Sequence, residues 1–149
     1  MLIQVTNRCQ MQCPHCLQDS TPYGGHMEFK TFMNALKFGY STCAHIYNIS
    51  GGEPTENPEL LRMCKVLNER SLYFILESNG MWIKDKEKTE IVEEIHSLPL
   101  CFGIQVYSDR TYYKEHQWLM NHITDFQKFN KVTVITSPIK NMQDLGRAR

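Results

Sequence analysis

The sequence predicts a parallel-stranded α/β fold, a partial TIM-like (β/α) barrel with about five strands and four helices. Two observations lead to this fold class. Short apolar segments alternate with amphipathic helical segments along the chain, and several apolar segments have one polar face. Strand–helix alternation implies right-handed crossovers and a parallel sheet. With 149 residues the chain has the size of one domain, so we expect residues 1–149 to form a single core domain.

The five expected strands are short apolar segments that end in polar or glycine-containing turns. They are Leu2–Thr6, His45–Ser50, Leu72–Leu76, Phe102–Tyr107 and Val132–Thr136. Gly51-Gly52 ends the second strand, and Asn79-Gly80 follows the third.

The four expected helices carry apolar residues at steps of three or four, which places these residues on one face. They are Met27–Tyr40, a helix that starts at Asn57-Pro58, Lys86–Leu98 and Tyr113–Phe126. Asn57 is a favourable N-cap, and proline suits the first helical position.

The strand faces distinguish a barrel from an open, doubly wound sheet. Central strands of such a sheet are apolar on both faces, whereas one face of these strands is polar. The polar face includes Gln4, Asn48, Gln105 and Tyr107. We therefore expect these side chains to line a binding cavity inside a curved, partly open barrel. A flat sheet with a few satisfied polar core residues is the alternative.

Composition excludes several classes of protein. The 16 basic and 16 acidic residues cancel, so no general attraction to nucleic acid or an anionic membrane is expected. No apolar run has the length of a membrane span, and residues 1–4 do not begin a signal sequence. We therefore expect a cytoplasmic protein, in which the six cysteines stay reduced and can bind metal.

Three cysteines lie in one short loop with the spacing CxxxCxxC. The loop reads Cys9-Gln-Met-Gln-Cys13-Pro-His-Cys16. Three thiolates this close can wrap one face of a compact cluster, whereas a [4Fe–4S] cluster normally takes four cysteines. One iron would then be open to a further ligand, as in catalytic metal sites. The spacing therefore favours a [4Fe–4S] cluster with an open iron.

A structural zinc site is the first alternative for this loop. It would need a fourth ligand, which His15, His26 or Cys43 could supply. Structural zinc sites more often have two paired ligand clusters, and the chain has no second CxxC or HxxxH pattern. A redox or disulfide role is a further alternative.

The CxxxCxxC motif, placed directly after the first strand, resembles the cysteine motif of the radical S-adenosylmethionine (SAM) superfamily. A second motif, Ser50-Gly51-Gly52-Glu53-Pro54, resembles the family's GGEP motif, which binds the methionine amino group of SAM. Glycines let a backbone approach a ligand closely, and Glu53 and nearby carbonyls can accept from an ammonium. A valine at Gly52 is expected to weaken SAM binding and to leave the cluster in place. Alone, Gly-Gly-Glu-Pro also reads as a turn that ends a strand.

Other positions match the family more weakly. Ser78-Asn79-Gly80 is similar to the family's Thr-Asn-Gly, whose hydroxyl and amide lie near the SAM ribose and carboxylate. Ser108 ends the fourth strand, where related enzymes often place a SAM-contacting serine. His15 precedes the third cysteine, at a position that usually lies against the adenine. Each alone reads as an ordinary turn residue, but together they mark the carboxyl ends of parallel strands, where barrels build their sites.

The resemblance spans Leu2 to about Ile139 and implies a radical SAM enzyme. In this family SAM chelates the open iron, the reduced cluster donates an electron, and a 5′-deoxyadenosyl radical abstracts hydrogen from a substrate. The implied partners are an electron donor such as flavodoxin or ferredoxin and a peptide, protein or small-molecule substrate. The alternatives are a glycyl-radical-enzyme activating enzyme and a non-catalytic iron–sulfur or zinc-binding domain.

The chain departs from the family in strand number. The family's partial barrel has six strand–helix units, and five strands are expected here, so the chain is a minimal or truncated member or is completed by a partner. Val132–Thr136 would form an apolar edge, for which we expect self-association, a partner or further chain. Cys43, Cys64 and Cys101 are too dispersed for an auxiliary cluster and are expected to be core or surface thiols.

Overall fold

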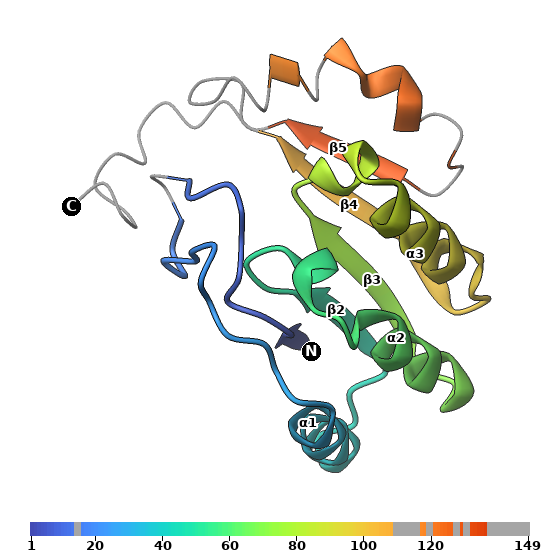
Figure 1. The fold of residues 1–149 in the computed structure, drawn as a ribbon. Helices are drawn as coiled ribbons and strands as arrows, with labels where there is room; N and C mark the ends of the chain where they lie inside the picture. The colour runs from blue at the N-terminus through green and yellow to red at the C-terminus, as the bar shows by residue number, and fades with distance from the viewer. Residues whose placement is uncertain (14–15, 109–116, 119–120, 127–128, 130–131, 137–149) are drawn as a thin grey trace.

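The computed structural model describes residues 1–13, 16–108, 117–118, 121–126, 129 and 132–136. Its five strands form one sheet in the order β1-β2-β3-β4-β5, and every neighbouring pair is parallel. The strands are β1 (Leu2–Gln4), β2 (Ile46–Ser50), β3 (Tyr73–Ser78), β4 (Cys101–Ser108) and β5 (Val132–Thr136). The predicted parallel α/β fold with five strands is confirmed, and all carboxyl ends lie at one edge of the sheet (Figure 1).

Three α-helices connect the first four strands: α1 (Phe29–Ser41), α2 (Leu60–Glu69) and α3 (Lys86–Ser97). Short 3₁₀ turns lie beside the sheet: η1 (Pro54–Glu56), η2 (Met81–Lys84) and η3 (Ile123–Phe126). Of the predicted fourth helix, Tyr113–Phe126, residues 113–116 and 119–120 lie outside the described residues. Residues 117, 118 and 121 are helical as predicted, and the end of the segment forms the 3₁₀ turn η3.

The predicted start of the second helix is wrong by two residues. The helix begins at Leu60 with Glu59 as N-cap, so Pro58 precedes it. Asn57 is used differently, because its Oδ1 accepts from the Glu59 N–H (2.8 Å) and its Nδ2 donates to the Val5 carbonyl (2.6 Å). Asn57 therefore ties this turn to the end of β1, and the buried carbonyl of Val5 gains a partner.

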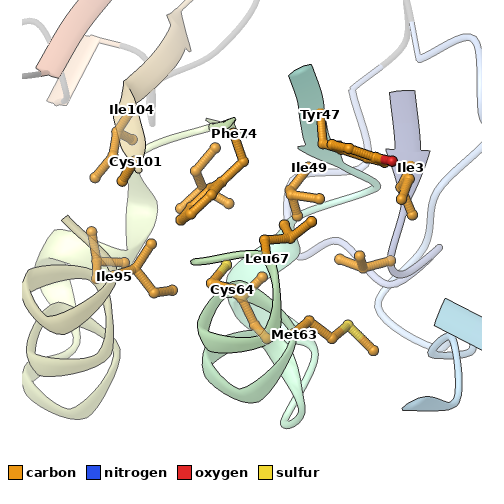
Figure 2. Close-up of a cluster of buried hydrophobic side chains, with 14 of the residues drawn as sticks. Ile3, Tyr47, Ile49, Met63, Cys64, Leu67, Phe74, Ile95, Cys101 and Ile104 are labelled. Carbon is orange, nitrogen blue, oxygen red and sulfur yellow. The ribbon is translucent and has the colours of Figure 1, made fainter. Parts of the chain in front are cut away.

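Alternate strand residues face the helices and form the core. Figure 2 shows Ile3, Ile49 and Phe74 pointing from the sheet toward side chains such as Leu67 and Ile95 of the helices. All five are at most 2% exposed. Burial of an aliphatic or phenyl side chain of this size stabilises by about 1.5–3 kcal/mol, so this layer holds the helices on one side of the sheet.

The other face of the sheet, called the inner face below, carries the alternate residues that do not pack on the helices. Its polar residues are Gln4, Asn48, Ser50, Glu77, Gln105, Tyr107 and Thr133, and the register also places Ile75, Gly103 and Ile135 on this face. Its amino half is apolar and largely exposed: Leu2, Ile46, Tyr73 and Phe102. The polar face that the sequence predicts is therefore present, and it lies toward the carboxyl ends.

In the described part of the chain, β5 is paired with β4 alone. Self-association or a partner at this edge stays a prediction, which sedimentation at several protein concentrations would test.

Among the described residues, no helix is long and apolar enough to cross a membrane.

Candidate functional site

The glycine motif and the cysteine loop are joined at the carboxyl end of β2. The Gly52 N–H donates to the Thr6 carbonyl, and the Glu53 N–H donates to the Arg8 carbonyl, both at 2.8 Å. The second bond ends one residue before Cys9. The turn after β2 therefore holds the chain segment from which the cysteine loop starts.

Gly52 has no room for a side chain. A Cβ at this position would lie 2.4 Å from the Arg8 carbonyl oxygen and 2.9 Å from Cβ of Cys9. A Cβ at Gly51 would lie 2.5 Å from the Thr6 carbonyl oxygen. All three distances are far below van der Waals contact, so the two glycines are required by the close approach of Thr6, Arg8 and Cys9.

Glu53 is fully buried and joins the ends of β2 and β3. Its Oε1 accepts from the backbone N–H of Thr55 (3.2 Å), the Thr55 hydroxyl (2.8 Å) and the Ser78 hydroxyl (3.0 Å). Its Oε2 accepts from the Ser78 hydroxyl (3.1 Å) and the Asn79 N–H (2.8 Å). The Gly80 N–H donates to Ser78 Oγ (3.0 Å), which leaves the serine proton for the carboxylate. Every neighbour of this carboxylate is a donor, so the ionised form fits the site.

Two opposing effects act on the pKa of Glu53. Burial raises the pKa above its ordinary value, and the hydrogen bonds from Asn79, Thr55 and Ser78 counteract that rise. An ionised carboxylate is tolerated in such a place only when its oxygens are satisfied, as they are here. Glu53 therefore braces the site, and no part of its side chain is exposed.

Glutamine in place of Glu53 is expected to destabilise the protein although it is nearly isosteric. One carboxylate oxygen becomes an NH₂ group that faces the N–H of Thr55 or Asn79, so donor faces donor. We expect a loss of about 1–3 kcal/mol in the free energy of unfolding, measured by urea denaturation. The matched control is Glu69→Gln at the exposed end of α2, which should change stability by less than about 0.5 kcal/mol. Equal stability of the two variants would contradict the bracing role.

Asn79 connects the brace to the cysteine loop. Its Oδ1 accepts from the Met81 N–H (2.9 Å), which fixes the orientation of the amide group. Its Nδ2 then faces Sγ of Cys9 at 3.7 Å and Oε1 of Gln10 at 3.5 Å. Asn79, which follows β3, is thus a donor to a cysteine sulfur of the motif from a distant part of the sequence.

The cysteines of the motif lie at different depths. Cys9 is buried, and Cys13 and Cys16 are half-buried. All six cysteines of the chain are described, and they are present as thiols instead of disulfides. Burial raises the pKa of the Cys9 thiol, against the lowering effect of the Met11 N–H. That N–H lies 3.5 Å from Cys9 Sγ, and the Ser20 N–H lies 3.4 Å from Cys16 Sγ.

The donor set of this loop fits an iron–sulfur cluster. Three thiols on one short loop, with N–H groups directed at two of the sulfurs, match the ligation and hydrogen bonding that such clusters use. Within the described residues, no three His, Cys, Asp or Glu side chains are gathered at metal-ligand spacing. Binding of a cluster would therefore require the three sulfurs to move closer together.

Two site residues expected from the sequence cannot be placed. His15 lies outside the described residues. Ser108 ends β4 as predicted, and its side chain lies outside the described part of the structure. Ser50 lies at the end of β2, where its carbonyl accepts from the Val5 N–H (2.8 Å).

Sequence reasoning missed three contributors to the site. Thr55 and Asn57 are buried and hold the turn after β2, and Thr6 contacts Nδ1 of His26 at 2.9 Å through its hydroxyl. The only available signal was their position beside the glycine motif or the cysteine loop. Glu77, on the inner face, was missed because the predicted third strand stops at Leu76.

Two cavities flank the cysteine loop. One, of about 740 Å³, lies beside β1 and is lined by residues that include Gln4, Asn7, Leu17 and His26. The other, of about 690 Å³, is lined by residues that include Gln10, Glu56, Met81 and Lys84. Neither is lined by the glycine motif, so the site is defined by its hydrogen bonds and not by these cavities.

A parallel sheet with cysteines after β1 and a glycine turn after β2 defines a class of iron–sulfur enzyme scaffold. The chain belongs to the radical SAM superfamily, whose family pattern matches residues 3–133. In fold it is similar to Streptococcus suis SuiB, solved bound to S-adenosylmethionine, with a TM-score of 0.55 and 13% sequence identity. That match covers 98% of this chain and 42% of SuiB. The partial-barrel fold class is thereby confirmed.

Two curated relatives are similar to parts of the chain. A PqqA peptide cyclase of Ruegeria pomeroyi is 30% identical over 83 residues, which cover 54% of this chain and 22% of the cyclase. A Methanocaldococcus jannaschii protein named as a glycyl-radical enzyme activating enzyme is 40% identical over 92 residues, covering 62% of this chain and 36% of that protein. The chain thus spans well under half the length of both relatives.

Proposed function

We propose that this chain is the catalytic core of a radical SAM enzyme that acts on a peptide or protein substrate. The observation that carries the proposal is the joining of the cysteine loop to the glycine motif through the Gly52 and Glu53 N–H groups. When bound, the cluster and SAM supply one-electron cleavage of SAM to a 5′-deoxyadenosyl radical that abstracts hydrogen. The peptide substrate is supported by the similarity to PqqA peptide cyclases.

The site residues divide into cluster ligands and SAM-binding residues. Cys9, Cys13 and Cys16 hold the cluster. The turn at Gly51 and Gly52 offers backbone carbonyls to the SAM ammonium. The motif can therefore bind SAM although the carboxylate of Glu53 is buried and already hydrogen-bonded.

The remaining expected SAM residues are proposed at the strand ends. Ser78 and Asn79 follow Glu53 across the sheet, and Ser108 ends β4. His15 is proposed to contact the adenine from the cysteine loop. Their common position at the carboxyl edge of a parallel sheet supports this assignment.

The deciding experiment is cleavage of SAM by the anaerobically reconstituted protein. With dithionite as reductant, we expect 5′-deoxyadenosine and methionine in equal amounts, detected by liquid chromatography. Protein that holds about four irons and cleaves no SAM would be a non-catalytic iron–sulfur domain. Protein that binds one zinc and no sulfide would be a zinc-binding domain.

A glycyl-radical-enzyme activating enzyme is the second candidate, because the Methanocaldococcus jannaschii relative has the higher identity of the two relatives described above. This candidate requires a protein substrate in which a glycine becomes a radical. A glycyl radical signal in the electron paramagnetic resonance spectrum of a partner, dependent on SAM and on this chain, would favour it over peptide cyclisation.

Alanine in place of Asn79 is expected to shift the midpoint reduction potential of the cluster to a more negative value. A donor to a cysteine sulfur stabilises the more negatively charged, reduced cluster, and Asn79 Nδ2 is such a donor to Cys9. The measurement is a redox titration without SAM, followed by electron paramagnetic resonance. The control is Gln10→Ala, which removes the side-chain oxygen that also accepts from Asn79 Nδ2 and leaves the donor to Cys9 in place. This variant should shift the potential less. An unchanged potential in Asn79→Ala would rule out this role.

A further inference from the structure

Glu77 is the only charged residue in the five strands of the sheet. It lies on the inner face, because its neighbours Leu76 and Ser78 are buried on the side of the helices and the glycine motif. Its half-buried carboxylate is therefore directed to the face that a radical SAM substrate would approach.

The carboxylate of Glu77 has a hydrogen-bond donor but no cationic partner among the described residues. Asn48 Nδ2 donates to Oε1 at 2.9 Å, and Oε2 accepts from no described residue. No Lys, Arg or His side chain of the described chain forms an ion pair with it. Oε2 therefore keeps acceptor positions to which a cationic group of a ligand can donate.

The surroundings of Glu77 form a polar row across three strands. Gln105 is its direct neighbour on β4, and the Tyr107 hydroxyl donates to Oε1 of Gln105 at 3.1 Å. Tyr107 lies close enough for the negative charge of Glu77 to add to the effect of burial in raising the pKa of the tyrosine. These neighbours are uncharged, so the row presents one fixed negative charge with polar groups on both sides.

The row lies next to the cofactor edge. Glu77 directly precedes Ser78 and Asn79, which bond to Glu53 and reach Cys9. A group that pairs with Glu77 would therefore lie beside the proposed cofactor site. It would be at the end of β3, whereas the glycine motif follows the neighbouring strand β2.

We infer that Glu77 is a substrate-positioning residue that pairs with an alkylammonium or guanidinium group of the substrate. Asn48 fixes one carboxylate oxygen, and the other accepts from the cationic group. This inference rests on the proposed function and specifies it, because it selects substrates with a lysine-like or arginine-like group near the reacting position.

The test uses reconstituted protein loaded with SAM and short acetylated peptides that differ only in a central Lys, Arg, Gln or norleucine. We expect the Lys and Arg peptides to bind about tenfold more tightly than the norleucine peptide, measured by calorimetry. Glu77→Gln should remove this preference, while iron content and SAM affinity stay unchanged. Glu69→Gln, on the exposed end of α2, is the matched control and should keep the preference.

Three outcomes would overturn the inference. They are an equal affinity of the unmodified protein for all four peptides, a preference that survives in Glu77→Gln, and a loss of SAM affinity in Glu77→Gln, which would make Glu77 a cofactor residue. Iron content and SAM cleavage are measured on the same samples, so failure of the proposed function is seen separately.

Discussion

Alanine at Cys9, Cys13 or Cys16 is expected to abolish cluster assembly. Each variant leaves two thiols on the loop, too few to hold three irons and leave the fourth open. Iron content after anaerobic reconstitution should fall from about four per chain to near zero, together with the broad charge-transfer absorption of the cluster. SAM cleavage should be lost with it.

Two cysteines outside the loop provide the controls. Cys43 is exposed and Cys64 is buried between the helices and the sheet, and alanine at either should leave the iron content unchanged. Cys64→Ala should also lower stability modestly, because it leaves a small cavity in the core. A loop variant that keeps four irons would contradict the ligand assignment, as would a requirement for Cys43 or Cys64.

Alanine at Gly52 is expected to displace the cysteine loop as well as to weaken SAM binding. The added Cβ would lie 2.4 Å from the Arg8 carbonyl oxygen, so the Glu53–Arg8 backbone hydrogen bond must break or the loop must move. Overpacking of this kind costs about 1–3 kcal/mol. We expect lower stability by urea denaturation and a reduced rate and yield of cluster assembly. Valine should have a larger effect than alanine.

Gly25→Ala is a matched control for this variant. Gly25 lies between the cysteine loop and α1, and a Cβ at this position would have no atom within 4 Å. It should therefore leave stability and cluster assembly unchanged. A Gly52→Ala protein with normal cluster assembly and weakened SAM affinity would support the simpler expectation from the sequence, that Gly52 serves only the cofactor.

The alternation of apolar strands and amphipathic helices was sufficient to predict the fold class. Core positions such as Phe32, Leu36 and Leu67 are buried as their spacing predicts. The ends of the elements, in contrast, depend on tertiary contacts. The second helix begins at Leu60 since Asn57 is bonded to Val5, and β3 extends to Ser78 since it pairs with β4 beyond Leu76.

The sequence by itself determined which motifs the chain carries and their order along the strands, because ligand spacing and glycine turns are local properties. Only the tertiary structure decided what each residue contacts. It buried Glu53 among hydrogen-bond donors, brought Asn79 to Cys9, and left Glu77 without a cationic partner among the described residues. The physical reason is that burial and hydrogen bonding join residues far apart in the chain, and strand register fixes which of them meet.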